Sequence, residues 1–597
     1  MKVSDYIVAK VEEYVDHVFL ISGGGCIHLV DSLSKSSVSL VPTLHEQGAS
    51  ICAESYSQYT NRLGALLVTT GPGATNALTG VASAWLDSIP LLVVSGQVQN
   101  KDRVGDRGVR QIGFQEINSV SIYKDITKYA VTIDDPLTVR FHVEKALWLA
   151  THGRKGPVLI DIPLDIQAAD IEPSSQEGFE APEFSYNQSL GCVSEILDQM
   201  DAAQRPVVLA GNGVRLANAV PEFLSFIRMT NVPVLTTWKA MDFLEETDPQ
   251  HVGRPGGVGQ RGANFNQQNA DFILVIGARL DHGQLAYQPQ YFAREAIRCI
   301  VDVDKNEIEK LGIPIHHPVQ MDAKVFLTEA NKLLKKDPLL ADPLPSKWLS
   351  TCKTLYEKYP VIEPTYLENE GLISNYAFIE YLSELLPPGS LLVPGSSGAC
   401  SEVTMQAFKC KKNTRVYNSE GLGAMGFGVP AAVGGCLASG NKETICIDGD
   451  GGFVMNIQEL ELARRYNLPI KFFVLNNDGY GSIKTTQNTH FGGRLVASDP
   501  SSGLTLPSVE LNAAAYKIPY FRIETQETLK QDLKTVLFTK GPVICELMVD
   551  PNHVTLPKAS VFKKEDGSFS TRPMEDLFPF LDRDEFRQHL LVKEVSD

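Results

Sequence analysis

The fold is decided by residues 445–483, which read ICIDGDGGFVMNIQELELARRYNLPIKFFVLNNDGYGSI. An apolar strand runs into a Gly-rich turn, a helix follows, and a second apolar strand ends in Asn-Asn-Asp-Gly. This order predicts a βαβ unit, whose two strands are parallel. Polar groups at the carboxyl ends of parallel strands meet at one edge of the sheet, so we expect Asp450 and Asn477 to lie close together.

These residue types indicate a clamp for a metal ion and a diphosphate. A carboxylate, an amide oxygen and a backbone carbonyl suit a hard cation such as Mg²⁺, which usually completes its shell with phosphate oxygens. Gly451 and Gly452 let the backbone approach a diphosphate, and the N-terminus of the following helix favours the anion. The pattern is similar to the thiamine-diphosphate signature, GDG followed by NN. An ordinary βαβ turn that contains Asp and Asn is the alternative.

Length and composition limit the classes of protein. A chain of 597 residues is too long for one core and predicts about three domains. The net charge of −17 argues against nucleic acid as the main partner. Ten cysteines without a CxxC motif indicate neither zinc nor a disulfide framework, and we expect reduced thiols in a cytoplasmic protein. No targeting peptide is recognisable, and no apolar window approaches the ~18 residues of a membrane span.

Apolar strands alternate with helical stretches in three blocks, at 1–180, 191–345 and 366–550, followed by a tail at 551–597. This alternation predicts an α/β protein with a doubly wound parallel sheet in each block, and ligands at the carboxyl ends of the strands. Polar, Pro-containing segments at 171–190 and 337–347 are expected linkers. The Pro-rich tail is expected to pack across the other domains.

A second polar feature, Glu46, follows an apolar strand and opens a helix. Stabilisation by the helix dipole would be enough to explain an acid there. Its surroundings add more, because the chain contains HEQGA at 45–49, GPGATN at 71–76, LDSIPLLVVSGQV at 86–98, GPVLIDIPLDIQ at 156–167 and GLGAMGFGVPAA at 421–432. With these motifs and the GDG–NN pair in this order, the chain resembles the thiamine-diphosphate-dependent acetolactate synthase (acetohydroxyacid synthase) family over about residues 1–550.

The resemblance implies a role for each matching residue. Glu46 would activate the aminopyrimidine of the cofactor, and Met425 would be the wedge that keeps the cofactor bent. Asp450 and Asn477, with the carbonyl of Gly479, would hold Mg²⁺. Gln115 and Lys128 would line the reaction centre as catalytic residues. Further cofactor contacts are implied at Gly24, Gly25, Pro72, Asn76, Gly398, Gly423, Gly449, Gly451, Gly452 and Tyr480. In the family Glu46 and the clamp come from different subunits, which implies a homodimer or homotetramer.

The middle block of the family binds FAD without using it for redox chemistry. The resemblance implies contacts at Gly211, Gly213, Gly277, Arg279, Asp302 and Asp322. Glycines at strand ends are also what any doubly wound domain needs for its tight turns. ADP, or no nucleotide at all, is therefore an alternative to FAD.

The implied reaction removes carbon dioxide from a 2-oxo acid such as pyruvate and transfers the two-carbon unit to an acceptor carbonyl. The chain departs from the family near the acceptor, where bulky Met and Trp positions after NN are Ser482 and Thr486, which suggests a larger pocket. A Gln-His pair near the diphosphate is here Ala399-Cys400. These changes favour a specialised ligase that acts on a ketone or a keto-sugar nucleotide in branched-sugar synthesis, as an alternative to acetolactate synthesis. Pyruvate decarboxylase, pyruvate oxidase and a non-catalytic relative are less favoured readings.

Overall fold

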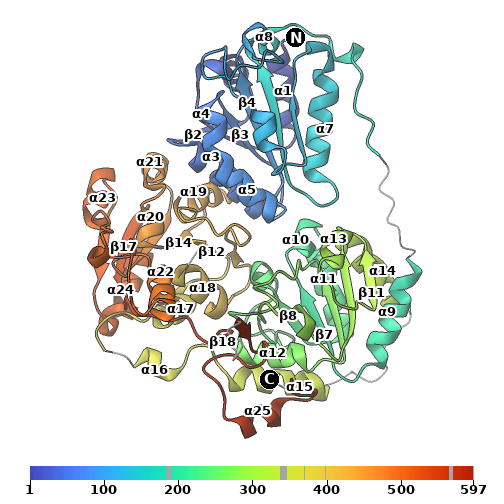
Figure 1. Cartoon of the computed structure of the whole chain (residues 1–597), viewed down its shortest axis with the longest axis vertical. Coiled ribbons are helices and arrows are strands. Elements are labelled where there is room, and N and C mark those ends of the chain that lie inside the picture. Colours follow the sequence, from blue (N-terminus) through green and yellow to red (C-terminus); the bar gives the residue numbers. More distant parts are fainter. Residues whose placement is uncertain (183–189, 337–345, 369, 397, 564–568, 596–597) are drawn as a thin grey trace.

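The computed structural model describes residues 1–182, 190–336, 346–368, 370–396, 398–563 and 569–595. Parts of both expected linkers, at 183–189 and 337–345, lie outside the described residues. Three parallel sheets form three lobes around a common centre (Figure 1). The predicted fold class, three doubly wound parallel sheets flanked by helices, is confirmed.

The first sheet has strand order β2-β1-β3-β4-β6-β5. Its strands are β1 (His17–Leu20), β2 (Ser39–Pro42), β3 (Gly64–Val68), β4 (Leu91–Gln97), β5 (Tyr129–Thr132) and β6 (Pro157–Pro163). The helices of this block are α1 (Val3–Glu12), α2 (Ile27–Leu33), α3 (Glu46–Thr60), α4 (Pro72–Asn76), α5 (Leu78–Leu86), α6 (Ser119–Tyr123), α7 (Val139–Thr151) and α8 (Leu164–Ala168).

The third sheet, β13-β12-β14-β15-β17-β16, repeats the strand order of the first. Its strands are β12 (Leu391–Pro394), β13 (Arg415–Val416), β14 (Thr444–Gly449), β15 (Ile470–Asn476), β16 (Tyr520–Ile523) and β17 (Val543–Met548). The helices are α17 (Asn375–Leu385), α18 (Ala399–Ala407), α19 (Gly428–Ala438), α20 (Asp450–Phe453), α21 (Leu460–Arg465), α22 (Gly481–His490), α23 (Val509–Tyr516) and α24 (Gln526–Phe538).

The middle sheet has five strands in the order β11-β10-β9-β7-β8. They are β7 (Pro206–Ala210), β8 (Val234–Thr236), β9 (Phe272–Ile276), β10 (Ile297–Asp302) and β11 (His317–Gln320). The helices of the block are α9 (Gly191–Ala202), α10 (Gly213–Leu216), α11 (Val220–Thr230), α12 (Arg261–Gln268), α13 (Lys305–Glu309) and α14 (Ala323–Lys336), and α15 (Ser346–Lys358) and α16 (Pro364–Leu367) lead to the third block.

The first and third blocks share one hydrophobic core, because α3 packs directly on α19. The helices approach so closely that a Cβ on Gly434 would lie 2.2 Å from the backbone oxygen of Cys52. Ser55, one turn further along α3, donates to the carbonyl of Ala431 at 2.6 Å. Glycine and small residues at this crossing allow two helices from different sheets to form a single core.

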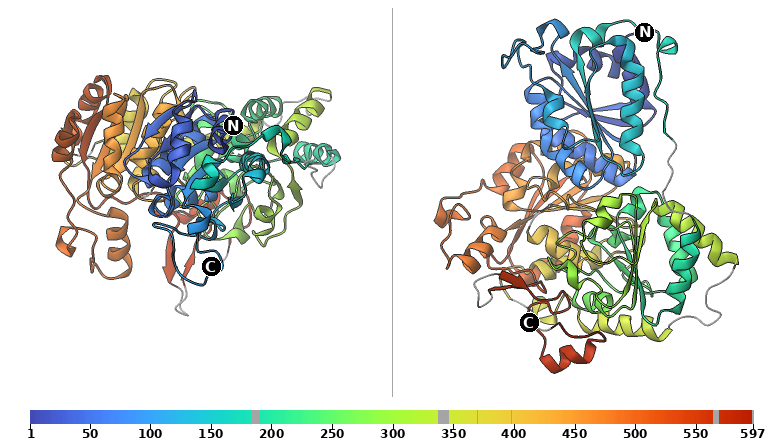
Figure 2. Two further views of the ribbon diagram at one scale, coloured as in Figure 1. Left: turned by 90° about the horizontal axis from the view of Figure 1, so that it is seen from above. Right: turned by 45° about the vertical axis from the view of Figure 1, so that its right-hand side comes forward.

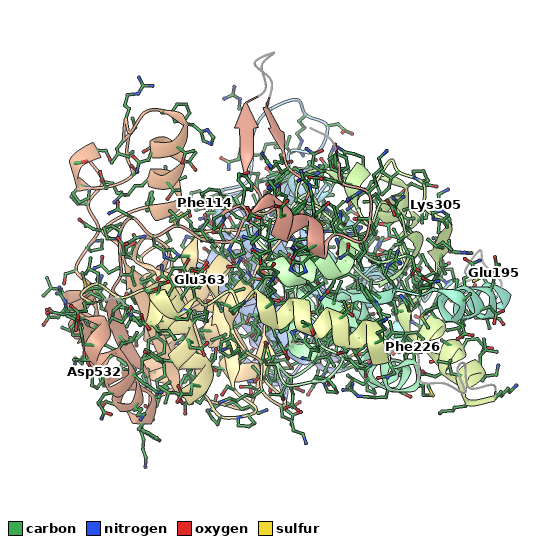
Figure 3. All side chains as sticks on the ribbon, turned by 90° about the horizontal axis from the view of Figure 1, so that it is seen from below. Phe114, Glu195, Phe226, Lys305, Glu363 and Asp532 are labelled. Atoms are coloured by element: carbon green, nitrogen blue, oxygen red, sulfur yellow. The ribbon has the colours of Figure 1, made fainter. Side chains whose placement is uncertain are left out.

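The tail packs against the middle and third blocks, as expected. Arg261 of α12 donates to the carbonyl of Leu577 at 3.0 Å, and Tyr376 of α17 donates to the carbonyl of Leu556 at 2.6 Å. The tail contains the antiparallel pair β18 (Val561–Lys563) and β19 (Phe569–Thr571) and the helix α25 (Arg583–His589). This strand pair projects from the body of the molecule (Figures 2 and 3). In the part of the chain that the structure describes, no helix combines the length and apolarity needed to cross a membrane.

Candidate active site

The GDG–NN stretch forms the expected parallel pair of strands. Gly449 of β14 is paired with Leu475 of β15, so both strands end at the same edge of the third sheet. Asp450 opens α20 and is 5% exposed; its carboxylate accepts from the backbone N–H of Gly451 at 2.7 Å and of Gly479 at 3.1 Å. Burial raises the pKa of Asp450 to about 6. A bound cation would counter that effect because it favours the charged form.

Asn477 supplies the observation that points to a metal. Its Oδ1 is buried and has no hydrogen-bond partner among the described residues, which is rare for a polar atom unless an ion or water satisfies it. Among those residues no group of three or more His, Cys, Asp or Glu side chains could hold a metal. A cation at this edge would therefore rely on one carboxylate with amide and carbonyl oxygens, a set that fits Mg²⁺ and a diphosphate.

A cavity of about 480 Å³ opens beside the clamp. The thioether methyl of Met425 lies 3.3 Å from where a Cβ on Gly451 would be, so Met425 stands over the GDG turn. All the residues predicted at the diphosphate half of the site line this cavity: Gly398, Gly423, Met425, Gly449, Asp450, Gly451, Gly452, Asn477, Gly479 and Tyr480. The divergent residues Ala399, Cys400, Ser482 and Thr486 line it as well.

The residues predicted at the pyrimidine half gather at the carboxyl end of the first sheet. Glu46 opens α3, is 9% exposed and accepts from Asn76 Nδ2 at 3.0 Å. Pro72 and Asn76 are the first and last residues of α4. Gly24 and Gly25 form a short 3-10 turn after β1, and Gly25 N–H donates to Thr69 Oγ1 at 3.1 Å. None of these residues lines the clamp cavity of the described chain.

Gln115 and Lys128 are placed differently from each other. Gln115 has φ +65° and its carbonyl lies beside Gly71, within reach of the GPGATN turn. Phe114, before it, is 86% exposed; its position is labelled in Figure 3. The Lys128 ammonium donates to the carbonyls of Leu149 and His152 at the end of α7, and burial lowers its pKa to about 8. The structure therefore does not bring Lys128 to Glu46. The Lys128 ammonium instead caps the C-terminal end of α7.

A second cavity, of about 340 Å³, lies where the first and middle blocks meet. Gly213, Gly277, Arg279, Asp302 and Asp322 line it, whereas Gly211 does not. Gly211 is needed for the crossing of two loops, because its Cβ would lie 2.3 Å from the carbonyl oxygen of Gly277. The cavity is at the topological switch point between β7 and β9, where doubly wound sheets bind nucleotides. Asp302 ends β10, and burial raises its pKa to about 6.

Two buried carboxylates near the candidate site were missed from the sequence. Asp448 is buried among Gly395, Gly428 and Gly452, and burial raises its pKa to about 7. Glu459 is buried and accepts from the backbone N–H of His45 at 3.0 Å, just before Glu46. The first is hidden inside an apolar strand pattern. The second joins residues that are far apart in the sequence, and no local signal reveals such a contact.

Three doubly wound sheets with a GDG–NN clamp define the class of thiamine-diphosphate enzymes. Family models support the class along the chain: the N-terminal TPP binding domain of thiamine pyrophosphate enzymes matches residues 1–122, the central domain matches 193–330, and the C-terminal TPP binding domain matches 396–547.

Similar proteins narrow this class. The chain is 30% identical to the acetolactate synthase large subunit of Lactococcus lactis subsp. lactis (strain IL1403), covering 91% of each chain. It is 33% identical to that of Buchnera aphidicola subsp. Acyrthosiphon pisum (strain APS), covering 88% of this chain and 90% of the relative. It is 31% identical to the chloroplastic acetolactate synthase of Arabidopsis thaliana, covering 93% and 82%. The chain belongs to the acetolactate synthase-like family of thiamine-pyrophosphate-dependent enzymes, which form carbon–carbon bonds.

Proposed function

We propose that the protein removes carbon dioxide from a 2-oxo acid, pyruvate, and transfers the remaining two-carbon unit to an acceptor carbonyl, as an acetolactate synthase does. The observation that carries this proposal is the clamp. A buried carboxylate, Asp450, and the unpartnered amide oxygen of Asn477 face one cavity with Met425. These are the residue types that a metal-bound diphosphate and a bent cofactor require.

Bound thiamine diphosphate would supply the nucleophilic carbon and accept the electrons released on decarboxylation. Asp450 and Asn477, with the carbonyl of Gly479, would hold Mg²⁺ against the diphosphate. The glycines of the turn serve close packing, because a Cβ on Gly451 would lie 2.5 Å from Tyr480 Cε1 and one on Gly452 would lie 2.2 Å from Asp448 Oδ1. Glu46 would hold a proton at the far ring nitrogen of the aminopyrimidine, and its burial keeps competing water away from that hydrogen bond.

We further propose that a second copy of the chain completes each site. No residue of the first block lines the clamp cavity in the described part of the chain. Apolar side chains are exposed beside both halves of the site: Leu44 is 48% exposed next to Glu46, Leu422 is 39% exposed next to the Met425 turn, and Met455 is 45% exposed after the GDG turn. We propose that these exposed apolar residues belong to an interaction surface. A homodimer or homotetramer would cover them and bring Glu46 to the clamp of its partner.

The cavity at the switch point of the middle sheet is proposed to hold FAD in a non-redox role. Asp302 and Asp322, which line this cavity, would accept from ribose hydroxyls, and the turn at Gly213 would lie beside the diphosphate. Purified protein should therefore be yellow and show flavin absorbance. A colourless protein that takes up added ADP but not FAD would assign ADP, and uptake of neither would refute the nucleotide site.

A specialised ligase is a second candidate, favoured by the helix after the clamp. Ser482 and Thr486 are exposed one turn apart on α22 and line the clamp cavity. The Thr486 hydroxyl donates to the carbonyl of Ser482 at 3.0 Å, so its small side chain stays against the helix. A cavity bordered by two small residues leaves space for an acceptor larger than a second pyruvate, such as a ketone or a keto-sugar nucleotide.

Product analysis separates the two candidates. The full-length protein with thiamine diphosphate, Mg²⁺ and FAD is given pyruvate alone, and then pyruvate with a series of ketones. Acetolactate from pyruvate alone supports the synthase, and a new carbon–carbon product only when a ketone is present supports the specialised ligase. Acetaldehyde as the sole product would refute both, because it means simple decarboxylation. A Glu46→Gln preparation made in parallel shows whether the activity belongs to this protein.

A further inference from the structure

Residues 418–421 are held by side chains from both of the other blocks. Asp87, at the end of α5, accepts from the backbone N–H of Glu420 at 3.0 Å and of Gly421 at 2.9 Å. Lys239 of the middle block donates to Asp87 at 2.6 Å and to the carbonyl of Asn418 at 2.9 Å. The Lys239 and Asp87 side chains are only 6% and 2% exposed. Buried charges of this kind persist only where their hydrogen bonds are satisfied.

A second set of contacts ties the same segment to the helix that begins with Glu46. The hydroxyls of Ser83 and Ser419 are 2.6 Å apart, and Ser83 also donates to Glu54 Oε1 at 2.8 Å. Glu54 lies in α3 and is fully buried. Gly421 must be glycine here, because a Cβ would lie 2.8 Å from Asp87 Oδ1. The backbone of the segment is thus fixed by the first and middle blocks.

The segment connects the two cavities. Glu420 lines the nucleotide cavity together with Asp87 and Lys239. Three to five residues later, Gly423 and Met425 line the clamp cavity. The connection is short, because only Leu422, Gly423 and Ala424 separate Gly421 from Met425.

We propose that residues 418–425 couple the two cavities, with Asp87 as the positioning residue, so that a nucleotide in the central cavity prepares Met425 for thiamine diphosphate. This inference rests on the proposed function. A nucleotide in this cavity would contact Glu420, whose backbone N–H is already held by Asp87, and would hold the segment still. The second ligand then has less ordering to do, so each ligand raises the affinity for the other by the same factor.

The test measures thiamine diphosphate affinity by calorimetry on full-length protein stripped of nucleotide, at constant Mg²⁺, with and without saturating FAD, and again with ADP. We expect FAD to tighten binding by a factor within the usual ~5–150-fold range of such couplings. FAD affinity should rise equally when thiamine diphosphate is present. The same gain with ADP would assign the effect to the adenosine diphosphate portion, and a gain only with FAD would assign it to the flavin end.

Asp87→Asn should abolish most of this coupling while FAD still binds. The matched control is Glu575→Gln, which alters another buried ion pair, between the tail and Arg294 of the middle block at 2.7 Å, that lines neither cavity. This variant should keep the full coupling. If Asp87→Asn fails to fold, Ser419→Ala removes only the neutral contact to Ser83 and should reduce the coupling.

Equal thiamine diphosphate affinity with and without nucleotide in the unmodified protein would overturn the inference, as would full coupling in both Asp87→Asn and Ser419→Ala. Either result leaves the proposed function standing, provided that the protein still binds thiamine diphosphate and consumes pyruvate. A protein that binds no thiamine diphosphate under any condition refutes the proposed function itself.

Discussion

The first and third sheets have the same strand order but carry different chemistry at equivalent strand ends. In the third sheet, the third and fourth strands are followed by Asp450 and Asn477. In the first sheet, the third strand is followed by Thr69, and the fourth ends at Gln97. Threonine and glutamine at those positions give no carboxylate for a cation. The topology provides matching places in both sheets, and the residue types make the third sheet the one that we propose to hold the metal.

The strands that come second along the chain in the two sheets, β2 and β13, show the complementary pattern. After β2 the chain reaches Glu46 and enters α3, and after β13 it passes Met425 and enters α19. These two helices pack on each other in the shared core. One connection therefore carries an acid for proton chemistry, and its counterpart carries an apolar wedge. In the proposed function, two related sheets therefore share one cofactor site.

Removing the acid of the first sheet should have the largest effect. Glu46→Gln keeps the size of the side chain but loses the carboxylate, so turnover of pyruvate should fall by ~10²–10⁴-fold, the usual contribution of a positioned acid or base. Thiamine diphosphate and Mg²⁺ should still bind, which calorimetry on the same preparation checks. Undiminished turnover in this variant would refute the role of Glu46.

Removing the acid of the third sheet should instead affect binding. Asp450→Asn should weaken Mg²⁺-dependent binding of thiamine diphosphate by at least the ~10–100-fold that loss of an outer-shell partner of a metal costs. Asp478→Asn is the matched control, because Asp478 is an exposed carboxylate in the same turn with φ +57°, a conformation that asparagine tolerates. If calorimetry shows equal affinity for the Asp450→Asn and unmodified proteins, Asp450 does not hold the metal-bound diphosphate.

The acceptor side offers a smaller, more selective effect. Thr486→Trp would fill part of the clamp cavity and should lower kcat/KM for a bulky ketone acceptor by about 10-fold relative to pyruvate, within the range that a change of pocket shape gives. Thr489→Trp, on the same helix but outside the cavity lining, is the control and should leave that ratio unchanged. If both variants show the same ratio, α22 does not contribute to the choice of acceptor.

The sequence predicted the central strands and the clamp, and missed four of the six edge strands and the long-range contacts. Strands such as β14 and β15 are apolar runs, because neighbours bury both of their faces. The strands β5, β11, β13 and β16 were not predicted, and all four lie at sheet edges, where apolar runs are short or absent. The clamp is readable because its parts flank one short helical connection, α20 and α21, between neighbouring strands. The Asp87–Lys239 pair is not, because its members belong to different blocks and each resembles an ordinary surface residue.

Mixing the Glu46→Gln and Asp450→Asn variants tests whether the two halves of one site come from different chains. If each site takes Glu46 from one copy and the clamp from another, a dimer of one Glu46→Gln chain and one Asp450→Asn chain contains one intact site and one doubly altered site. Random exchange of subunits places half of the chains in such mixed dimers, so the mixture should recover about a quarter of the unmodified activity, as expected for a two-fold symmetric interface. The assay measures pyruvate consumption after co-expression of the two variants, and the double variant Glu46→Gln/Asp450→Asn, mixed with either single variant, is the control that should stay inactive. No recovery in a mixture shown by mass spectrometry to contain mixed dimers would mean that both halves of the site come from one chain, and that the two sheets meet by a domain movement rather than by assembly.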